Sequence, residues 1–306
     1  MKNKKWSSVF ILLMFAFVGC NRMESPSDTP TFGNITISAD ETIKPLIESE
    51  VNTFTSIYQY TKVKVNYKPE QEAFNDLMND STRLIIVTRS LNSSEFKQFH
   101  KWEIVPKITK IAFDAVALIC SGDMKDSVIS IEGLKNLLSG RDIKNFRKTK
   151  IVFDDNNSST IFVLREKTGV KQLSSNCYAL NSNEAVLDYV KKEKNTVGVI
   201  GVNWISDNDD STEQHFMKSI RVMAVSYTDT SESFKPYQAY IALKKYPLWR
   251  EIYILSKEAY TGLGTGLTAF IASDRGQRIV LKFGLVPATM PVRLVELTNE
   301  NFKVVN

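Results

Sequence analysis

Three stretches of this 306-residue chain place short polar side chains at the start of an expected helix. They are residues 38–42 (SADET), 88–90 (TRS) and 156–160 (NNSST). The first turn of a helix has N–H groups without an intrahelical partner and a partial positive charge, so it can hold an oxyanion without a formal cation. The same residue types also cap helices, and capping accounts for each turn taken singly. The order of the three along the chain favours an anion site.

Residues that would support catalysis or bind a cofactor are sparse in this chain. The two histidines, His100 and His215, lie in polar stretches typical of solvated side chains. The sequence contains no HExxH, CxxC, GxSxG or P-loop pattern. The glycine-rich run 262–266 (GLGTG) follows no buried strand directly and has no phosphate-binding lysine, so we expect a turn before a helix. The chain is therefore not expected to be an enzyme or to bind a cofactor.

Carboxylates and thiols offer little basis for a metal site. Glu41, Asp154 and Asp155 are the one candidate set of ligands, and adjacent loop carboxylates usually face water. No metal is therefore expected. Cys120 and Cys177 both lie in mainly apolar stretches, which is typical of buried thiols. An oxidising compartment would also allow them to pair, and the sequence leaves both states open.

The first 19 residues have the pattern of an export signal. Three lysines within the first five residues precede the short apolar run 9–18, after which come Gly19 and Cys20. A cysteine at the cleavage point resembles the bacterial lipobox, although Phe17 stands where leucine is commoner. We therefore expect Cys20 to carry a lipid, and a plain secreted protein is the alternative. Residues 20–33 are polar and rich in proline, as in a flexible tether.

Composition sets limits on the mature chain. Three of the formal +5 charges belong to the signal, which leaves 5 − 3 = +2. This small excess, without a dense lysine or arginine cluster, gives no reason to expect a nucleic-acid partner. No apolar run reaches the ~18–20 residues of a membrane-spanning helix. A hydrophobic content of 43% over this length predicts a large core divided between two lobes.

Hydrophobic periodicity predicts alternating strands and helices, which is typical of an α/β fold with largely parallel sheets. Strands are expected at residues 34–38, 62–67, 83–88, 111–120, 151–153, 197–202, 220–225 and 239–243. Helices are expected at residues 42–54, 73–78, 96–102, 130–138, 161–167, 183–193, 267–272 and 275–283.

Six segments within residues 34–291 resemble the periplasmic phosphate-binding proteins of phosphate ABC importers, in that family's order and spacing. They are ETIKPL, KITKIAFDAVALI, NSSTIFVLRE, VGVIGVNW, KKYPLWREIYIL and FIASDRGQRIVLKFGLVP. The resemblance implies a two-lobed periplasmic-binding-protein fold of type II. Its two mixed, mostly parallel sheets would flank a ligand cleft. Lobe 1 would comprise residues 34–118 and 239–306, and lobe 2 residues 119–238.

The family's phosphate site carries over only in part. In the third loop the family has an arginine, an acid and then Ser-Gly-Thr. This chain keeps Ser158 and Thr160, replaces the glycine with Ser159, and has Asp154 and Asn156 at the arginine and acid positions.

The other loops of the resemblance also differ. The family's aspartate in the second loop falls at Arg83, and its first loop becomes Asp40 and Glu41 followed by Thr42. Arg83 or Arg89 would then supply the cation, or the ligand is not free phosphate. The expected ligand-binding residues are Glu41, Thr42, Arg83, Thr88, Arg89, Asp154, Ser158, Ser159 and Thr160.

The resemblance implies an extracytoplasmic solute-binding lipoprotein of the cell envelope. It would capture an oxyanion, with phosphate as the expected ligand, and deliver it as a monomer to an ABC permease and its ATPase. The alternative is a membrane-anchored sensing protein of the same fold that binds a different ligand. A hydrolase is the least expected function.

Overall fold

The structure is a computed structural model that describes residues 28–122, 124, 126–141, 143, 146–206, 220–291, 294–297 and 302–305. The expected signal peptide, Cys20 and the tether up to residue 27 lie outside the described residues.

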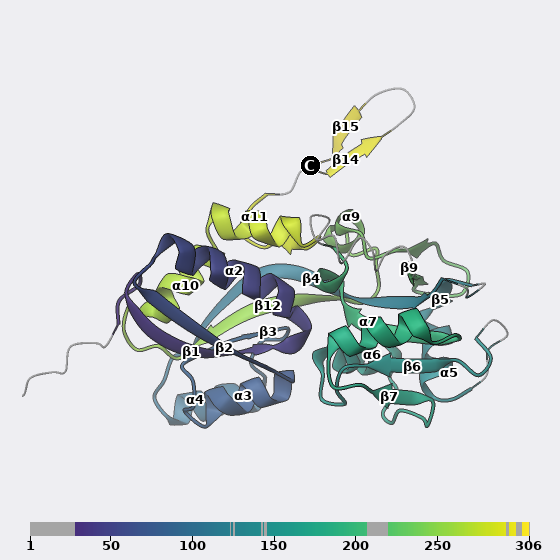
Figure 1. Ribbon diagram of the computed structural model, residues 1–306, viewed down its shortest axis with the longest axis horizontal. Coiled ribbons are helices and arrows are strands. Elements are labelled where there is room, and N and C mark those ends of the chain that lie inside the picture. Colours follow the sequence, from purple (N-terminus) through teal and green to yellow (C-terminus); the bar gives the residue numbers. More distant parts are fainter. Residues whose placement is uncertain are drawn as a thin grey trace, which may run out of the picture.

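A single curled ten-stranded sheet runs through both halves of the molecule (Figure 1). Its main order is β2-β1-β3-β12-β4-β8-β6-β7, and β13 and β9 also pair with β4. These strands are β1 (Gly33–Asp40), β2 (Thr61–Lys68), β3 (Leu84–Val87), β4 (Lys107–Ser121), β6 (Lys150–Phe153), β7 (Cys177–Ala179), β8 (Thr196–Gly201), β9 (Ile220–Val222), β12 (Trp249–Ser256) and β13 (Val286–Pro287). A small second sheet contains β5 (Val128–Ser130), β10 (Ala224–Ser226) and β11 (Ser233–Phe234), and β14 (Leu294–Leu297) pairs with β15 (Phe302–Val305).

Helices cover the sheet on both faces in each half (Figure 1). The helices are η1 (Glu41–Ile43), α2 (Lys44–Ile57), α3 (Glu70–Met78), α4 (Ser93–Lys101), α5 (Ile131–Leu138), α6 (Ser159–Thr168), α7 (Asn183–Lys192), η2 (Val202–Trp204), α9 (Gln238–Ala242), α10 (Leu263–Ile271) and α11 (Asp274–Lys282). In lobe 1, α3 and α4 pack on one face of β3, while α2, α10 and α11 lie on the other. All four residues of β3 are therefore buried, as a strand between two helical layers requires.

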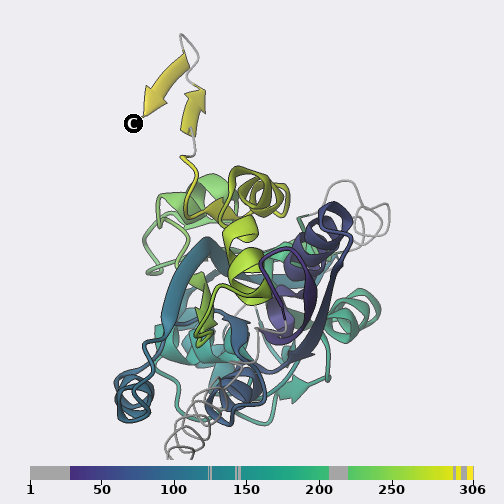
Figure 2. The same cartoon turned by 90° about the vertical axis from the view of Figure 1, so that its left-hand side faces the viewer.

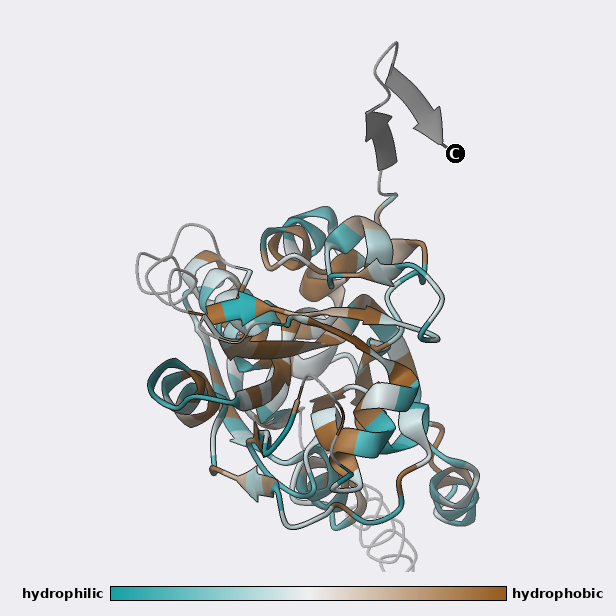
Figure 3. Ribbon diagram, turned by 90° about the vertical axis from the view of Figure 1, so that its right-hand side faces the viewer, coloured by the Kyte–Doolittle hydropathy of each residue, from teal (hydrophilic) through white to brown (hydrophobic). Residues whose placement is uncertain are grey.

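Strand β4 joins the two lobes. It pairs with β12 from Lys107 to Ala115, and then with β8 from Val116 to Cys120. The expected two sheets are consequently continuous through one long strand. The expected lobe boundaries stay a prediction, and the change of partner between Ala115 and Val116 marks where β4 passes from one lobe to the other. Seen from the end of lobe 2, hydrophobic residues concentrate on the inner strands (Figure 3).

Most expected elements are confirmed with shifted ends, and three expectations are wrong. Residues 239–243 belong mainly to helix α9 rather than to a strand. The expected strand at 220–225 is divided into β9 and β10 around Met223. The run 262–266 is not a turn, because α10 already begins at Leu263. Cys120 and Cys177 are thiols rather than the two halves of a disulfide.

The last residues of the expected tether are packed against lobe 1. Asp28 is buried and accepts hydrogen bonds from the side chains of Arg83 and Tyr260. A Cβ atom at Gly266 would lie 1.9 Å from the carbonyl oxygen of Pro30, so this close approach requires a glycine. Residues of the expected tether from Asp28 onward are therefore fixed to lobe 1.

Candidate functional site

Arg250 on β12 is the one buried arginine among the described residues, and it sits where the two lobes meet. The antiparallel register places it directly opposite Asp114 on β4. Its Nε and Nη2 atoms lie 2.8 and 2.7 Å from one carboxylate oxygen of Asp114. Burial raises the pKa of Asp114, and the adjacent guanidinium opposes that rise. The pair supplies a fixed cation at the base of the cleft.

The guanidinium also contacts one hydroxyl from each lobe. Nη1 donates to Oγ of Ser159 at the start of α6 (2.7 Å), and Nη2 donates to Oγ1 of Thr42 in η1 (3.1 Å). The two hydroxyl oxygens are 3.0 Å apart. Thr42 and Ser159 thus connect lobe 1 to lobe 2 directly, and separation of the lobes would release Ser159 and the Nη1 of Arg250 to donate to an oxyanion.

The turn that carries Thr42 is held in place by residues of lobe 2. Its carbonyl oxygen accepts hydrogen bonds from Asn203 Nδ2 and Trp204 Nε1, each at 2.9 Å. A Cβ atom at Gly201 would lie 2.6 Å from the same oxygen. This contact between the lobes therefore explains the presence of Gly201, Asn203 and Trp204 in the VGVIGVNW segment.

Carboxylates of the chain already occupy the donors at each turn that faces the cleft. Asp40 accepts from the backbone N–H of Thr42 at 3.0 Å and from its hydroxyl at 2.9 Å. Glu70 accepts from the backbone N–H and hydroxyl of Thr88 at 2.6 and 2.9 Å. Glu41 reaches across to lobe 2, where it accepts from both the backbone and side chain of Asn183.

The third loop follows the same pattern. Ser158 caps α6 by accepting from the backbone N–H of Thr160 at 3.2 Å, and the two hydroxyls are 2.9 Å apart. The Thr160 hydroxyl donates to Asp154 at 3.3 Å. Asp154, Ser158, Ser159 and Thr160 are all buried. The hydroxyl groups of Thr42, Thr88, Ser158 and Thr160 in the cleft-facing turns therefore have hydrogen-bond partners within the protein.

Burial raises the pKa values of three of these acids toward neutral pH. Burial, with Asp154 as a further negative neighbour, raises the pKa of Glu41 to about 7. Burial and the nearby Asp40 raise the pKa of Glu70 to about 7. The pKa of Asp154 rises to about 6, mainly through burial. A carboxyl group that keeps its proton can donate a hydrogen bond to an anion.

A cavity of about 270 Å³ lies between the lobes beside this cluster. Thr88 and Arg89 line it from lobe 1, Phe162 and Lys167 line it from α6, and Arg250 lies at its wall. Arg89 is engaged elsewhere in lobe 1, because both Nη atoms contact the carboxylate of Glu95 at 2.9–3.0 Å. The cavity therefore reaches the buried cluster at Arg250.

Among the described residues, no group of three or more histidine, cysteine, aspartate or glutamate side chains is arranged to hold a metal ion. Within the same part of the chain, no helix is long and apolar enough to cross a bilayer.

Comparison with known proteins assigns the chain to a family. A family model described as a PBP superfamily domain matches residues 24–275. The chain belongs to the PBP superfamily. It is also 23% identical over 271 residues to the phosphate-binding protein PstS of Borreliella burgdorferi, covering 82% of this chain and 89% of that protein.

Solved structures of similar proteins share the two-lobed fold of this PBP superfamily member. A protein from Clostridium perfringens, assigned as a phosphate ABC transporter substrate-binding protein and holding phosphate, has a TM-score of 0.71 at 20% identity, and covers 84% of this chain and 100% of its own. An ABC-type phosphate transport receptor from Vibrio cholerae has a TM-score of 0.62 at 18% identity, with the same coverage of 84% and 100%. At these identities the likeness establishes the α/β type II fold.

Arg83 is the one expected site residue that lies far from the cluster. It precedes β3, at the edge of the sheet opposite the cleft, and its Nε lies 2.8 Å from Glu258 while Nη2 contacts Asp28. The expectation that Arg83 points into the cleft is wrong, because the buried acids Asp28 and Glu258 bind it at the other end of the strand.

We expect Arg83→Ala to lower stability and leave oxyanion affinity unchanged. The substitution leaves Asp28 and Glu258 buried without their cation, at a cost of about 2 kcal/mol after allowing for the partial exposure of Arg83. Urea unfolding measures the first quantity and calorimetry with phosphate the second. A fall in phosphate affinity without a change in stability would contradict this assignment.

The structure adds residues that the sequence reasoning missed, namely Arg250, Asp114, Glu70 and Asn203. One local signal was available, because Asp114 and Arg250 are charged residues within otherwise apolar strands. A charge in a strand buried on both faces requires a partner. The sequence does not state which residue that partner is.

Proposed function

We propose that this protein is an extracytoplasmic solute-binding protein that captures phosphate between its lobes and passes it to an ABC permease. One observation carries the proposal: a buried arginine converges with hydroxyls from opposite lobes, Thr42 and Ser159. Lobe opening would break the contacts that Ser159 makes with Arg250 and Thr42, and closure around an oxyanion would replace those contacts with hydrogen bonds to the ligand. The phosphate-binding relatives support the choice of ligand.

The expected ligand set is accordingly revised in this proposal. Thr42, Ser158, Ser159 and Thr160 contribute hydroxyls, and Arg250 takes the role of cation that Arg83 or Arg89 was expected to fill. Glu41, Thr88 and Asp154 border the site. The site holds the ligand without catalysing a reaction, and the chain acts as a lipid-anchored monomer of the cell envelope through Cys20.

The acids around the site determine how it can accept an anion. Asp114, Asp40 and Glu70 act electrostatically on the buried guanidinium of Arg250, and Asp154 in turn lies near Asp40 and Glu41. An additional negative charge raises the pKa of each nearby carboxyl further. Phosphate capture should therefore be accompanied by proton uptake, chiefly by Glu41, Glu70 and Asp154.

We expect phosphate affinity to rise as the pH falls from about 8 to about 6. The pKa values of about 7 for Glu41 and about 6 for Asp154 in the free protein place the titration in this window. Each proton taken up changes the affinity by up to about tenfold per pH unit. Calorimetry in buffers of different ionisation enthalpy counts these protons after subtraction of the titration of phosphate itself.

The matched control is Glu41→Gln with Asp154→Asn, which cannot take up those protons. The double variant should bind more tightly than wild type at pH 8 and show a flatter pH profile. Binding without proton uptake would contradict the role of the acids. Failure of wild type to bind phosphate at any pH would contradict the proposed ligand.

A second candidate ligand is a cation or zwitterion, which is favoured by the excess of carboxyl groups over Arg250 in the cleft. A ligand of this class would bind more tightly as the pH rises and the acids ionise. The same calorimetric pH series with an organic amine distinguishes it from phosphate, since the two pH dependences have opposite signs.

A further inference from the structure

The first described residue, Asp28, is fixed on lobe 1. Asp28 is 2% exposed, and the Tyr260 hydroxyl donates to it at 2.6 Å, while the guanidinium of Arg83 contacts its other oxygen. Glu258 holds the same arginine and accepts the first backbone N–H groups of α10. The chain is therefore held against lobe 1 from Asp28 onward.

Only residues 21–27 separate the expected lipid on Cys20 from this fixed point. Seven residues span at most ~25 Å when fully extended. An acyl chain inserted in a bilayer would therefore keep Asp28 within that distance of the membrane surface. This short reach favours an orientation in which the edge of lobe 1 around Asp28 faces the lipid.

This edge is where β1, β2, β3 and β4 begin and β12 ends. The registers Gly33↔Thr61 and Lys107↔Ser256 align those strand ends, and the backbone of Lys257 donates to the carbonyl of Arg83 at 2.9 Å. Figure 2 faces this side of the molecule, with α4 nearby. The cleft turns lie at the opposite ends of β1 and β3.

Large apolar side chains are exposed at this edge in two groups, Phe32 and Tyr60 beside β1 and β2, and Trp102, Val105 and Ile108 between α4 and the start of β4. We define the edge patch as Phe32 (56% exposed), Tyr60 (79%), Trp102 (40%), Val105 (87%) and Ile108 (36%). The rings of Phe32 and Tyr60 are neighbours, with centroids 6.5 Å apart. Exposed clusters of aromatic and aliphatic side chains mark interaction surfaces, and Trp and Tyr favour the interface between lipid and water.

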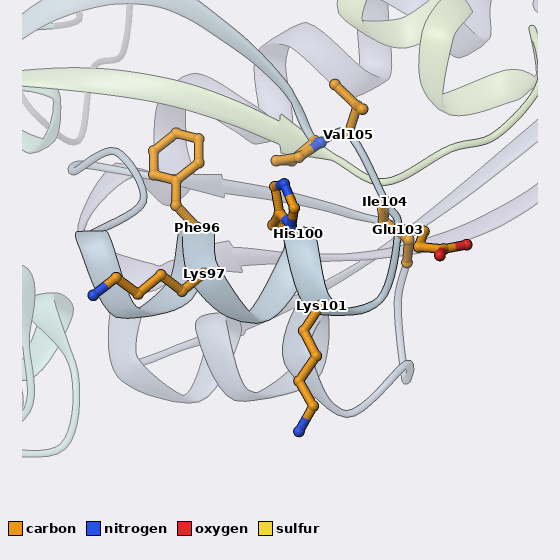
Figure 4. Close-up of a pocket in the computed structure, with 8 residues that line it drawn as sticks. Phe96, Lys97, His100, Lys101, Glu103, Ile104 and Val105 are labelled. Atoms are coloured by element: carbon orange, nitrogen blue, oxygen red, sulfur yellow. The ribbon is translucent and has the colours of Figure 1, made fainter.

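Lysines border the edge patch. The exposed basic residues are Lys62, Lys97, Lys101 and Lys107, and exposed acids nearby are Glu103 and Asp80, of which Asp80 pairs with Lys257. In Figure 4, Lys97 and Lys101 extend from α4 on the side away from Phe96 and Val105. Apolar side chains beside an excess of lysine match the chemistry of an anionic lipid surface.

We propose that the edge patch docks on an anionic lipid bilayer and holds the cleft away from the membrane. The inference rests on the proposed acylation of Cys20. A lipid on Cys20 and a short spacer would keep the edge patch close to the membrane, which makes the bilayer its expected binding partner. Docking adds a second membrane contact to a single lipid anchor, which by itself often gives reversible binding.

The test uses the mature chain carrying Cys20→Ser, which has no acyl chain. We expect it to sediment with vesicles of equal parts phosphatidylglycerol and phosphatidylcholine at low salt, and not with phosphatidylcholine alone. Tyr60→Ser with Val105→Asp should weaken this binding by about tenfold or more, because it removes apolar area and adds a negative charge. Phosphate affinity in solution should stay unchanged in the same variant.

The matched control is Tyr178→Ser with Val128→Asp, which alters exposed residues of lobe 2 and should not change vesicle binding. In the acylated protein, brominated lipid should quench part of the tryptophan fluorescence. The quenched part should be missing from the acylated Trp102→Phe variant. Equal vesicle binding by both double variants, or no quenching of Trp102, would overturn the docking surface. Release of the acylated wild type by a salt wash would instead contradict the anchor, while the vesicle results on the unacylated chain still decide the surface.

Discussion

Replacing Arg250 with methionine is expected to destabilise the protein by about 3–5 kcal/mol and to abolish phosphate binding. The guanidinium neutralises Asp114, which is fully buried, and it joins Thr42 to Ser159. Removing one partner of a buried ion pair leaves an uncompensated charge, which is the costly step. Urea unfolding measures the change in stability, and calorimetry measures the binding.

A second substitution separates structural from ligand-binding roles of Arg250. Arg250→Met combined with Asp114→Leu removes the whole pair, and such replacements often restore stability. We expect the double variant to recover most of the lost stability while phosphate affinity stays at least about 100-fold below wild type, since charge-assisted hydrogen bonds to the anion remain absent. Recovery of both quantities would show that Arg250 does not bind the ligand.

Replacing Glu50 is expected to stabilise the protein, with a gain that grows with pH. Glu50 lies on the buried face of α2, and within the described structure neither of its carboxylate oxygens has a hydrogen-bond partner. Burial raises its pKa from 4.5 to about 9. The folded protein therefore keeps a proton at neutral pH that the unfolded chain releases.

The sign of the effect follows from this difference in bound protons. Below a pH of about 4.5 both states hold the proton and the group costs nothing through ionisation. Between about pH 4.5 and 9 the unfolded state alone gains by ionising, so stability falls by about 1.4 kcal/mol per pH unit, which amounts to roughly 3 kcal/mol at pH 7.

Glu50→Gln removes the titration, and Glu50→Leu also removes the buried polar atoms. The advantage of Glu50→Gln over wild type should increase by about 2–3 kcal/mol between pH 5 and pH 7, and Glu50→Leu should be more stable still. Thermal or urea unfolding across this pH range measures the difference. Parallel pH profiles for wild type and Glu50→Gln would show that Glu50 is ionised in the folded protein.

Local sequence determined which segments could form elements and where anion-binding turns could lie. The capping box at Asn92 and Glu95 and the cap of α6 at Ser158 involve residues close in the chain, so residue type alone predicts them. The apolar run of β4 likewise predicts a buried strand. The region 239–243 was predicted wrongly because five apolar or aromatic residues fit a short strand and a short helix equally well.

The tertiary structure decided which turn residues meet and which arginine donates hydrogen bonds to them. Arg250 and Asp114 are 136 positions apart, and the antiparallel register of β12 and β4 brings them together. Arg83 and Thr88 are separated by only one short strand, yet they lie at opposite edges of the sheet, because four buried residues of β3 stand between them. A side chain's type is written in the sequence, whereas its partner across the sheet depends on strand order and register, which are long-range properties of the fold.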